Sequence, residues 1–270
     1  MSRFRKMSLP RPNRADSLWK GCIWAYPAGW EKGFRAGGSL QTACLEDEMK
    51  GQGVWVGSLD DNNYIELDMG RSLDEGLSDD KIEWADIQGY YDSTLVSAVV
   101  LFRPDSIQNS EQPLINKQDG PAPNSGWGIT VSFGGDPSPN GYHFQINDGA
   151  VREFSVANVQ STSRSDVLCM TYDRVTLKGF QNGVLIGSLG ATGAITLNND
   201  PVALFGDGVQ PNLQGSIGMA AAWNRPLSNA EVERLYADPY IMWRNDLHKE
   251  FMFGPGRAPV GGLGTYFLIF

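Results

Sequence analysis

The dipeptide Asn182-Gly183 constrains the fold of this chain more than any other feature of the sequence. It separates two runs of apolar and β-forming residues, Val175–Gln181 and Val184–Ser188. Asn-Gly between such runs is the strongest short-range hairpin signal, because both central residues of the turn need a positive φ. The sequence therefore predicts an antiparallel hairpin at this point.

Short runs with the two-residue period of a half-buried strand recur from about residue 21 onward. Ile65, Leu67 and Met69 share one face of such a run. Further runs lie at residues 54–56, 96–102, 129–133, 142–146, 167–172, 202–205 and 216–223. Residues 71–92 are polar and acidic and are typical of an inserted loop. Strands at this spacing, without alternating helices, predict an all-β sandwich or barrel.

The composition suits one large β domain. The chain has 270 residues, of which 41% are hydrophobic and 20% charged, so a single core can be buried. The 32 glycines and 15 prolines supply the turns that many short strands need.

One helix is predicted near the C-terminal end of this pattern. Ser228 is a good N-cap, and Glu231 three residues later completes a capping box. Leu227 can pack on Val232 as a hydrophobic staple. The helix spans about two turns, so it must pack on the sandwich to be stable.

Four motifs follow one another in the last third of the sequence. They are an aliphatic run ending in Thr-Tyr-Asp, a strand ending in Asn-Gly, a Gly-Ser-Ile strand and a Leu-Ser-x-x-Glu-x-x-x-Leu-Tyr helix, at residues 167–173, 175–185, 213–217 and 227–236. This succession resembles the C-terminal half of the laminin G-like jelly-roll family, which has concanavalin A-like topology. One departure is Ser165-Asp166, where the family often has Trp-His.

The resemblance implies a two-sheet antiparallel jelly roll over residues 21–245, with an N-terminal arm (1–20) and a C-terminal tail (246–270). Leu235–Tyr240, a Leu-Tyr-Ala-Asp-Pro sequence followed by an aromatic residue, is similar to an ending common in phage-encoded members. Those members tend to be virion surface components.

The N-terminal arm is basic, with one acid and six cationic residues: Arg3, Arg5, Lys6, Arg11, Arg14 and Lys20. It is either a solvated terminus or an arm that lies on an acidic neighbour in an assembly. The tail ends in five large apolar residues, among them Tyr266, Phe267 and Phe270. Because exposed apolar ends aggregate, we expect them to pack on the parent sandwich or to add a strand to a neighbouring subunit.

The net charge of −9 disfavours nucleic acid as a partner, and no apolar run is long enough to cross a membrane. The three cysteines, Cys22, Cys44 and Cys169, have neither disulfide-framework nor metal-like spacing. The basic start of the chain lacks the apolar stretch of a signal peptide. We therefore expect synthesis in a cytoplasm. The resemblance to phage-encoded members of the family implies that this is a host cytoplasm and that the protein is located in a virion.

The sequence gives little support to catalysis. Some concanavalin A-like glycosidases place Glu-x-Asp-x-Glu on one strand, so that alternate carboxylates enter the groove. Glu66 and Asp68 match the first two positions, but Gly70 occupies the third. We therefore expect no enzyme activity and no catalytic residues, and keep a degenerate glycosidase-like sandwich as a second alternative.

Glycan binding requires aromatic faces and hydrogen-bonding groups. Trp127, which follows Asn124 in a Gly-containing segment, is a candidate for display by a loop, with core or interface packing as the alternative. His143 lies on the outward phase of its strand. No cofactor is expected apart from calcium, for which Asp60, Asp61 and Asn62 are candidate ligands or simple turn residues.

These observations predict a non-enzymatic virion component that decorates a capsid or tail, contacts host glycans, and binds other virion proteins or its own copies through its termini. The alternative is a free carbohydrate-binding or adhesion module.

Overall fold

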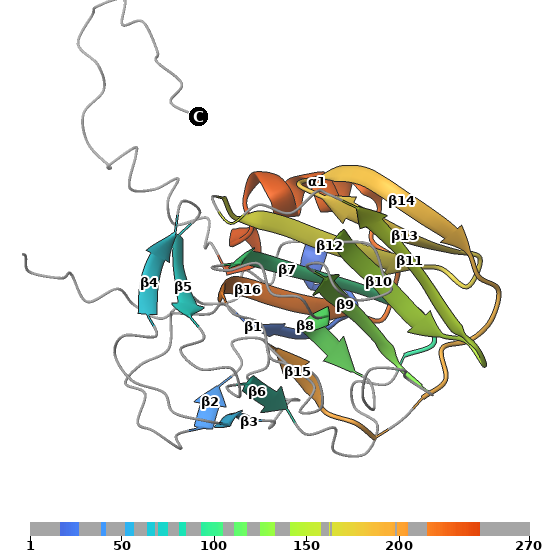
Figure 1. The fold of residues 1–270 in the computed structure, drawn as a ribbon, viewed down its shortest axis with the longest axis horizontal. Coiled ribbons are helices and arrows are strands. Elements are labelled where there is room, and N and C mark those ends of the chain that lie inside the picture. The colour runs from blue at the N-terminus through green and yellow to red at the C-terminus, as the bar shows by residue number, and fades with distance from the viewer. Residues whose placement is uncertain are drawn as a thin grey trace, which may run out of the picture.

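The computed structural model describes residues 17–26, 39–41, 52–56, 64–67, 70–74, 81–84, 93–104, 111–117, 125–132, 141–157, 162, 164–197, 199–204 and 215–243. Within these residues the chain forms two antiparallel β-sheets and a single α-helix (Figure 1). The prediction of an all-β two-sheet sandwich with a short helix is confirmed.

Sheet A has eight strands. They are β1 (Cys22–Tyr26), β4 (Tyr64–Leu67), β5 (Gly70–Asp74), β7 (Val96–Pro104), β12 (Asp166–Tyr172), β13 (Thr176–Gln181), β14 (Val184–Gly190) and β16 (Gly215–Trp223). Their order is β14-β13-β12-β7-β16-β5-β4, and β1 pairs with another part of β16. The strand β14 therefore lies at one edge of the sheet.

Sheet B also has eight strands. They are β2 (Ser39–Gln41), β3 (Gln52–Val56), β6 (Lys81–Trp84), β8 (Glu111–Lys117), β9 (Trp127–Ser132), β10 (Gly141–Asn147), β11 (Val151–Ala157) and β15 (Val202–Leu204). Their order is β11-β10-β9-β8-β15-β6-β3-β2. The prediction of an inserted loop at residues 71–92 is wrong in part, because most of β5 and all of β6 lie in that range.

The hairpin predicted at Asn182-Gly183 joins β13 to β14. The two residues have φ values of 52° and 79°, so both occupy the left-handed region that the sequence required. The Asn182 side chain also connects the turn to β12, since its Oδ1 accepts a hydrogen bond from the Val167 amide at 2.8 Å.

The main core lies between the two sheets and follows the alternation of the strands. In β7, Val96, Ala98, Val100 and Phe102 all belong to it and are buried. The intervening residues Val99 and Leu101 belong to a second core on the opposite side of sheet A. Central strands of sheet A are thus buried on both faces, which explains their almost continuous apolar sequence.

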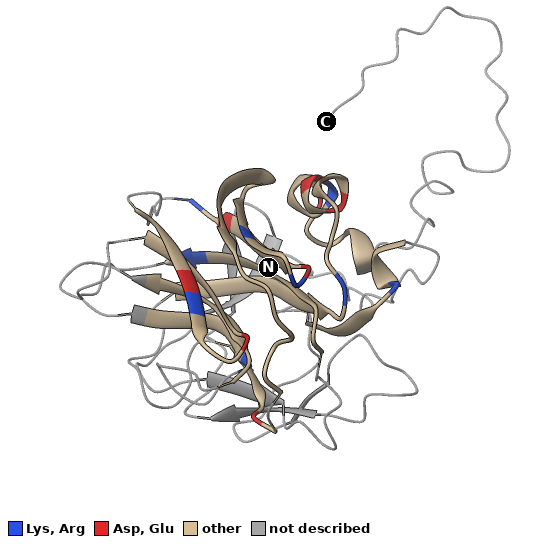
Figure 2. Ribbon diagram, turned by 90° about the vertical axis from the view of Figure 1, so that its right-hand side faces the viewer, with Lys and Arg blue, Asp and Glu red and all other residues tan. Residues whose placement is uncertain are grey.

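The helix α1 (Asn229–Ala237) covers this second core. Its Val232 and Leu235 are buried, and Figure 2 shows the helix end-on, outside the two sheets. The predicted capping box is confirmed: Ser228 Oγ accepts a hydrogen bond from the Glu231 amide, while the Glu231 carboxylate accepts one from the Ser228 amide at 2.9 Å. The predicted staple residue Leu227 lies in the same core as Val232.

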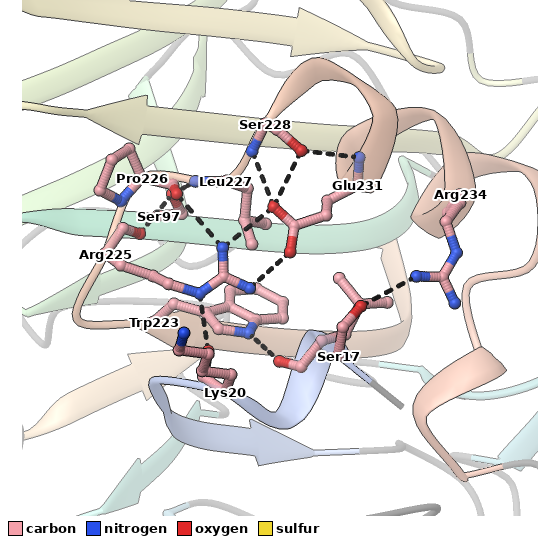
Figure 3. A network of polar contacts seen from close by, with 11 residues as sticks. Ser17, Lys20, Ser97, Trp223, Arg225, Pro226, Leu227, Ser228, Glu231 and Arg234 are labelled. Carbon is pink, nitrogen blue, oxygen red and sulfur yellow. Dashed lines mark hydrogen bonds and ion pairs between the residues drawn. The ribbon is translucent and has the colours of Figure 1, made fainter. Parts of the chain in front are cut away.

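A polar network fastens the start of the described chain to this helix (Figure 3). The short helix η1 (Ser17–Trp19) is held because Trp223 Nε1 donates to the Leu18 carbonyl at 2.6 Å. Arg225 Nε donates to the Lys20 carbonyl at 2.7 Å. At the other end, Trp19 Nε1 donates to the Met242 carbonyl of η4 (Ile241–Trp243) at 2.8 Å. Residues far apart in sequence are therefore joined beside α1.

Glu231 links the capping box to this network and gives it a pH dependence. Its carboxylate accepts two hydrogen bonds from the Arg225 guanidinium, at 2.9 and 2.6 Å. Chiefly because of Arg225, with Ser228 adding hydrogen bonds against a cost of burial, the pKa of Glu231 falls from 4.5 to about 2. A depressed folded-state pKa stabilises the fold above pH 4.5, and that stabilisation is lost as the pH falls toward 2.

We predict that Glu231→Gln lowers the free energy of unfolding at pH 7 by about 1–2 kcal/mol. The difference from wild type should shrink between pH 4.5 and 2, measured by thermal unfolding across that range. Glu233→Gln, at an exposed position of the same helix, is the matched control and should change neither quantity. Equal pH profiles for the Glu231 variant and wild type would contradict the prediction.

Candidate ligand-binding face

The side of sheet B that faces away from the main core carries polar side chains that strand register brings together. Tyr142, Phe144 and Ile146 of β10 enter the main core. Their neighbours His143 and Gln145 must therefore point to the opposite side, since side chains alternate along a strand. Residues directly paired across strands share a face, so the register of β8, β9 and β11 identifies the remaining members.

One row of this face crosses four strands. Gln145 pairs with Gly128 on one side and with Glu153 on the other, and Gly128 pairs in turn with Asn116. A second row contains Thr130, His143 and Ser155. We call the set Asn116, Thr130, His143, Gln145, Glu153 and Ser155 the polar face. Because neighbouring strands lie about 4.8 Å apart, Asn116 and Gln145 are separated by about 10 Å, with Gly128 and no side chain between them.

The amides of the polar face are buried and incompletely satisfied. Asn116 and Gln145 are each 1% exposed. Among the described residues, neither Asn116 Nδ2 nor Gln145 Nε2 has a hydrogen-bond partner. A buried amide group without a partner costs about 1–3 kcal/mol, so such groups are rare in native proteins and call for a partner such as a ligand or an ordered water.

The open end of the row lies at β11, where Glu153 has a side-chain exposure of 33%. Its Oε1 is 2.7 Å from Nδ1 of the fully buried His143. The histidine therefore fixes the position of the carboxylate, which keeps further acceptor capacity toward the solvent. Amide donors, a carboxylate acceptor and hydroxyl groups in one plane are suited to binding a hydroxyl-rich molecule.

The structure corrects one site prediction. Trp127 is not displayed by a loop: it lies in β9, is 1% exposed, and packs in the main core. Its register explains the difference, because Trp127 pairs with the inward-facing Ile146. The outward position of His143 agrees with the prediction, although its ring is covered.

Most other predicted site residues lie outside the described part of the chain. These are Asn124, the calcium candidates Asp60, Asp61 and Asn62, and the assembly candidates Arg3, Arg5, Lys6, Tyr266, Phe267 and Phe270. The described residues contain no group of three or more His, Cys, Asp or Glu side chains arranged to bind a metal. Nor do they contain a helix with the length and apolarity of a membrane span. Glu66 lies in β4, paired with Arg71 in sheet A and not on the polar face.

Sequence reasoning missed Asn116, Gln145 and Glu153. Gln145 alternates with apolar residues in a recognisable strand, so its outward direction was available from the sequence. Asn116 and Glu153 lie in β8 and β11, two strands that the alternation did not identify. Strand β8 is interrupted by a register shift between Pro113 and Ile115, which disrupts its two-residue period.

Solved structures with similar folds include a domain of an arabinanase and botulinum neurotoxin binding domains. Domain 4 of AbnA, an extracellular GH43 arabinanase from Geobacillus stearothermophilus in complex with arabinotriose, matches with a TM-score of 0.58 and 15% identity, covering 80% of this chain and 98% of that one. The botulinum neurotoxin serotype D binding domain matches with a TM-score of 0.59 and 14% identity, over 84% of this chain and 54% of that one. The chain thus spans about half the length of the neurotoxin structures.

No curated protein matches the sequence. A family model does: the laminin G model described as the concanavalin A-like lectin/glucanases superfamily matches residues 76–233. That match includes strands of both sheets and most of α1. Together with the two-sheet topology, it confirms the family resemblance seen in the sequence: this chain belongs to the concanavalin A-like lectin/glucanases superfamily.

Proposed function

We propose that this protein is a non-enzymatic glycan-binding component of a virion surface and that the polar face holds the glycan. The observation that carries the proposal is the pair of buried, unpartnered amide groups of Asn116 and Gln145 in one row with Glu153. Sugar hydroxyls both donate and accept hydrogen bonds, so a single sugar ring supplies acceptors for the amides and donors for the carboxylate.

A binding role suits this face better than hydrolysis does. Glycosidases of the common type need two carboxyl groups, about 5–9.5 Å apart, on opposite sides of the scissile bond. Among the described side chains of the polar face, Glu153 is the sole carboxylate. The arabinotriose complex of the AbnA domain supports a carbohydrate as the ligand class, because that domain shares the fold over nearly its whole length.

Placement on a virion rests on a different observation, the ending Leu235–Tyr240 and its likeness to phage-encoded members of the family. Mass spectrometry of purified particles tests this part by asking whether the chain is present and at what copy number. Glycan binding by a chain that is absent from particles would favour the alternative, a free carbohydrate-binding or adhesion module.

The glycan site is tested by removing one amide while keeping its volume. We predict that Gln145→Leu lowers affinity at least about tenfold for whichever glycan the wild-type chain binds on a glycan array, because a buried hydrogen bond is lost. The same change should leave the melting temperature unaltered or higher, since an unsatisfied buried amide is replaced by an apolar group.

Gln112→Leu is the matched control. Gln112 is also a fully buried glutamine with unpartnered amide atoms, but it pairs with Val131, whose side chain enters the main core. Its replacement should therefore preserve glycan binding. Equal loss of affinity in both variants, or full affinity in Gln145→Leu, would refute the assignment of the polar face.

A further inference from the structure

The segment around β14 differs from the rest of this acidic protein in having no charge. Between Lys178 and Asp200 the sequence contains no acidic or basic residue, although the chain as a whole has 31 acidic and 22 basic residues. This segment includes β14, which is paired with β13 alone among the described strands (Figure 1). The β14 edge of sheet A is thus uncharged along its whole length.

Apolar side chains are exposed at the same edge. Val184 and Leu185, the first two residues of β14, are 65% and 48% exposed. Natural sheet edges are usually protected against pairing by charges, prolines or bulges. The edge strand β11 of sheet B follows this rule, because it carries Arg152 and Glu153 (Figure 2). The strand β14 carries neither a charge nor a proline, and its single bulge, at Ile186, leaves Gly187–Gly190 in regular register with β13. An edge of this kind is suited to accept another strand.

The chain itself contains a matching strand. Its last five residues, Tyr266–Phe270, are large and apolar, and residues 258–270 carry no charge. Aromatic and β-branched residues favour strands. The length also fits, since residues 265–270 are about as long as the seven-residue β14.

We propose that residues 265–270 of one copy of this protein add as a strand to the β14 edge of a second copy. Residues 244–264 separate this segment from the last described residue, and such a stretch spans up to about 70 Å when extended, enough to reach a neighbouring molecule. The proposal concerns assembly and does not depend on glycan binding.

Charge favours a second copy as the acceptor. Trp19 Nε1 donates a hydrogen bond to the Met242 carbonyl, so residues near the two ends of the described chain lie side by side. Residues 1–16 hold five basic residues and one acid, whereas the whole chain has a net charge of −9, so the remainder is strongly acidic. A tail that reaches a neighbouring copy therefore brings a basic segment toward an acidic sandwich, which lowers the repulsion between copies.

Two defective variants of the full chain test this arrangement. Val184→Lys/Leu185→Lys places a charge on each face of the acceptor edge, and Phe267→Asp/Leu268→Asp does the same in the donor segment. We expect wild type to self-associate in size-exclusion chromatography with light scattering. Each double variant should lower the association constant at least about tenfold. Val175→Lys, at a 61% exposed position outside β14, is the control and should associate like wild type.

Mixing the two variants gives the decisive result. The edge variant still donates a tail and the tail variant still offers an edge, so an equimolar mixture should form one-to-one dimers and nothing larger. A mixture that stays monomeric, as when each tail packs on its own sandwich, would overturn the proposal. Persistent dimers of the tail variant alone, as when two β14 edges pair directly, would overturn it as well.

Discussion

Asp166→Ala should lower the free energy of unfolding by about 3–5 kcal/mol and the melting temperature by about 10 °C. The Asp166 side chain is fully buried and accepts hydrogen bonds from Tyr142 Oη at 2.5 Å and from Asn182 Nδ2 at 2.7 Å. Arg164 Nε lies 3.1 Å from its Oδ1. Removing the carboxylate leaves a buried hydroxyl and an amide without this acceptor, and each such loss costs about 1–3 kcal/mol.

This network joins the two sheets, which is why its loss is costly. Asp166 begins β12 of sheet A, Tyr142 belongs to β10 of sheet B, and Asn182 forms the hairpin turn. Burial, reinforced by the adjacent Asp166 carboxylate, raises the pKa of Tyr142 far above its usual value of 10, so the hydroxyl remains a donor. Tyr142→Phe removes one of the bonds and should cost about 1–2 kcal/mol.

Thermal and urea unfolding measure these differences. Glu233→Ala, an acid exposed on α1, is the control and should stay within about 0.5 kcal/mol of wild type. A loss below about 1 kcal/mol for Asp166→Ala would contradict the role of the carboxylate as the junction between the sheets. The sequence marks Ser165-Asp166 as a departure from the family pattern, and in the structure Asp166 accepts hydrogen bonds from Tyr142 and Asn182.

The features that the sequence predicts are those encoded within a few neighbouring residues. The Asn182-Gly183 turn and the Ser228–Glu231 capping box depend on local backbone preferences, and both have the predicted geometry. In strands 96–104 and 141–147, the alternation of side chains along the sequence likewise indicates which residues face the core. These signals suffice for the fold class and for the helix.

The polar face could not be predicted in the same way, because it depends on the register between strands that are distant in sequence. Asn116 and Gln145 lie in one row because both pair with Gly128, one from each side. No short-range pattern in the sequence encodes these two pairings. The same limitation explains Trp127, which follows a turn-like segment but pairs with an inward-facing partner. The sequence predicted a loop at residues 71–92 because β5 and β6 are short and are separated by a stretch with acidic residues.

Gly141→Ala is the second change with a large expected effect, a loss of about 2–4 kcal/mol. A Cβ on Gly141 would lie 1.9 Å from the Val156 carbonyl oxygen and 2.6 Å from its carbon. Both atoms belong to the backbone of β11, so no side-chain rotation relieves the clash. Strand β11 must move away from β10, and the Gly141–Ala157 end of the pair should open first.

This displacement connects stability to the candidate site, because β11 carries Glu153 and β10 carries its partner His143. Hydrogen exchange should therefore show faster exchange of the β11 amides in Gly141→Ala, and glycan affinity should fall with it. Gly190→Ala is the matched control: this strand glycine has no atom within 4 Å of the added Cβ, so its replacement should be neutral. Unchanged β11 exchange in Gly141→Ala would mean that the strand pair absorbs the extra carbon, and that Glu153 is not held by this close approach of the two backbones.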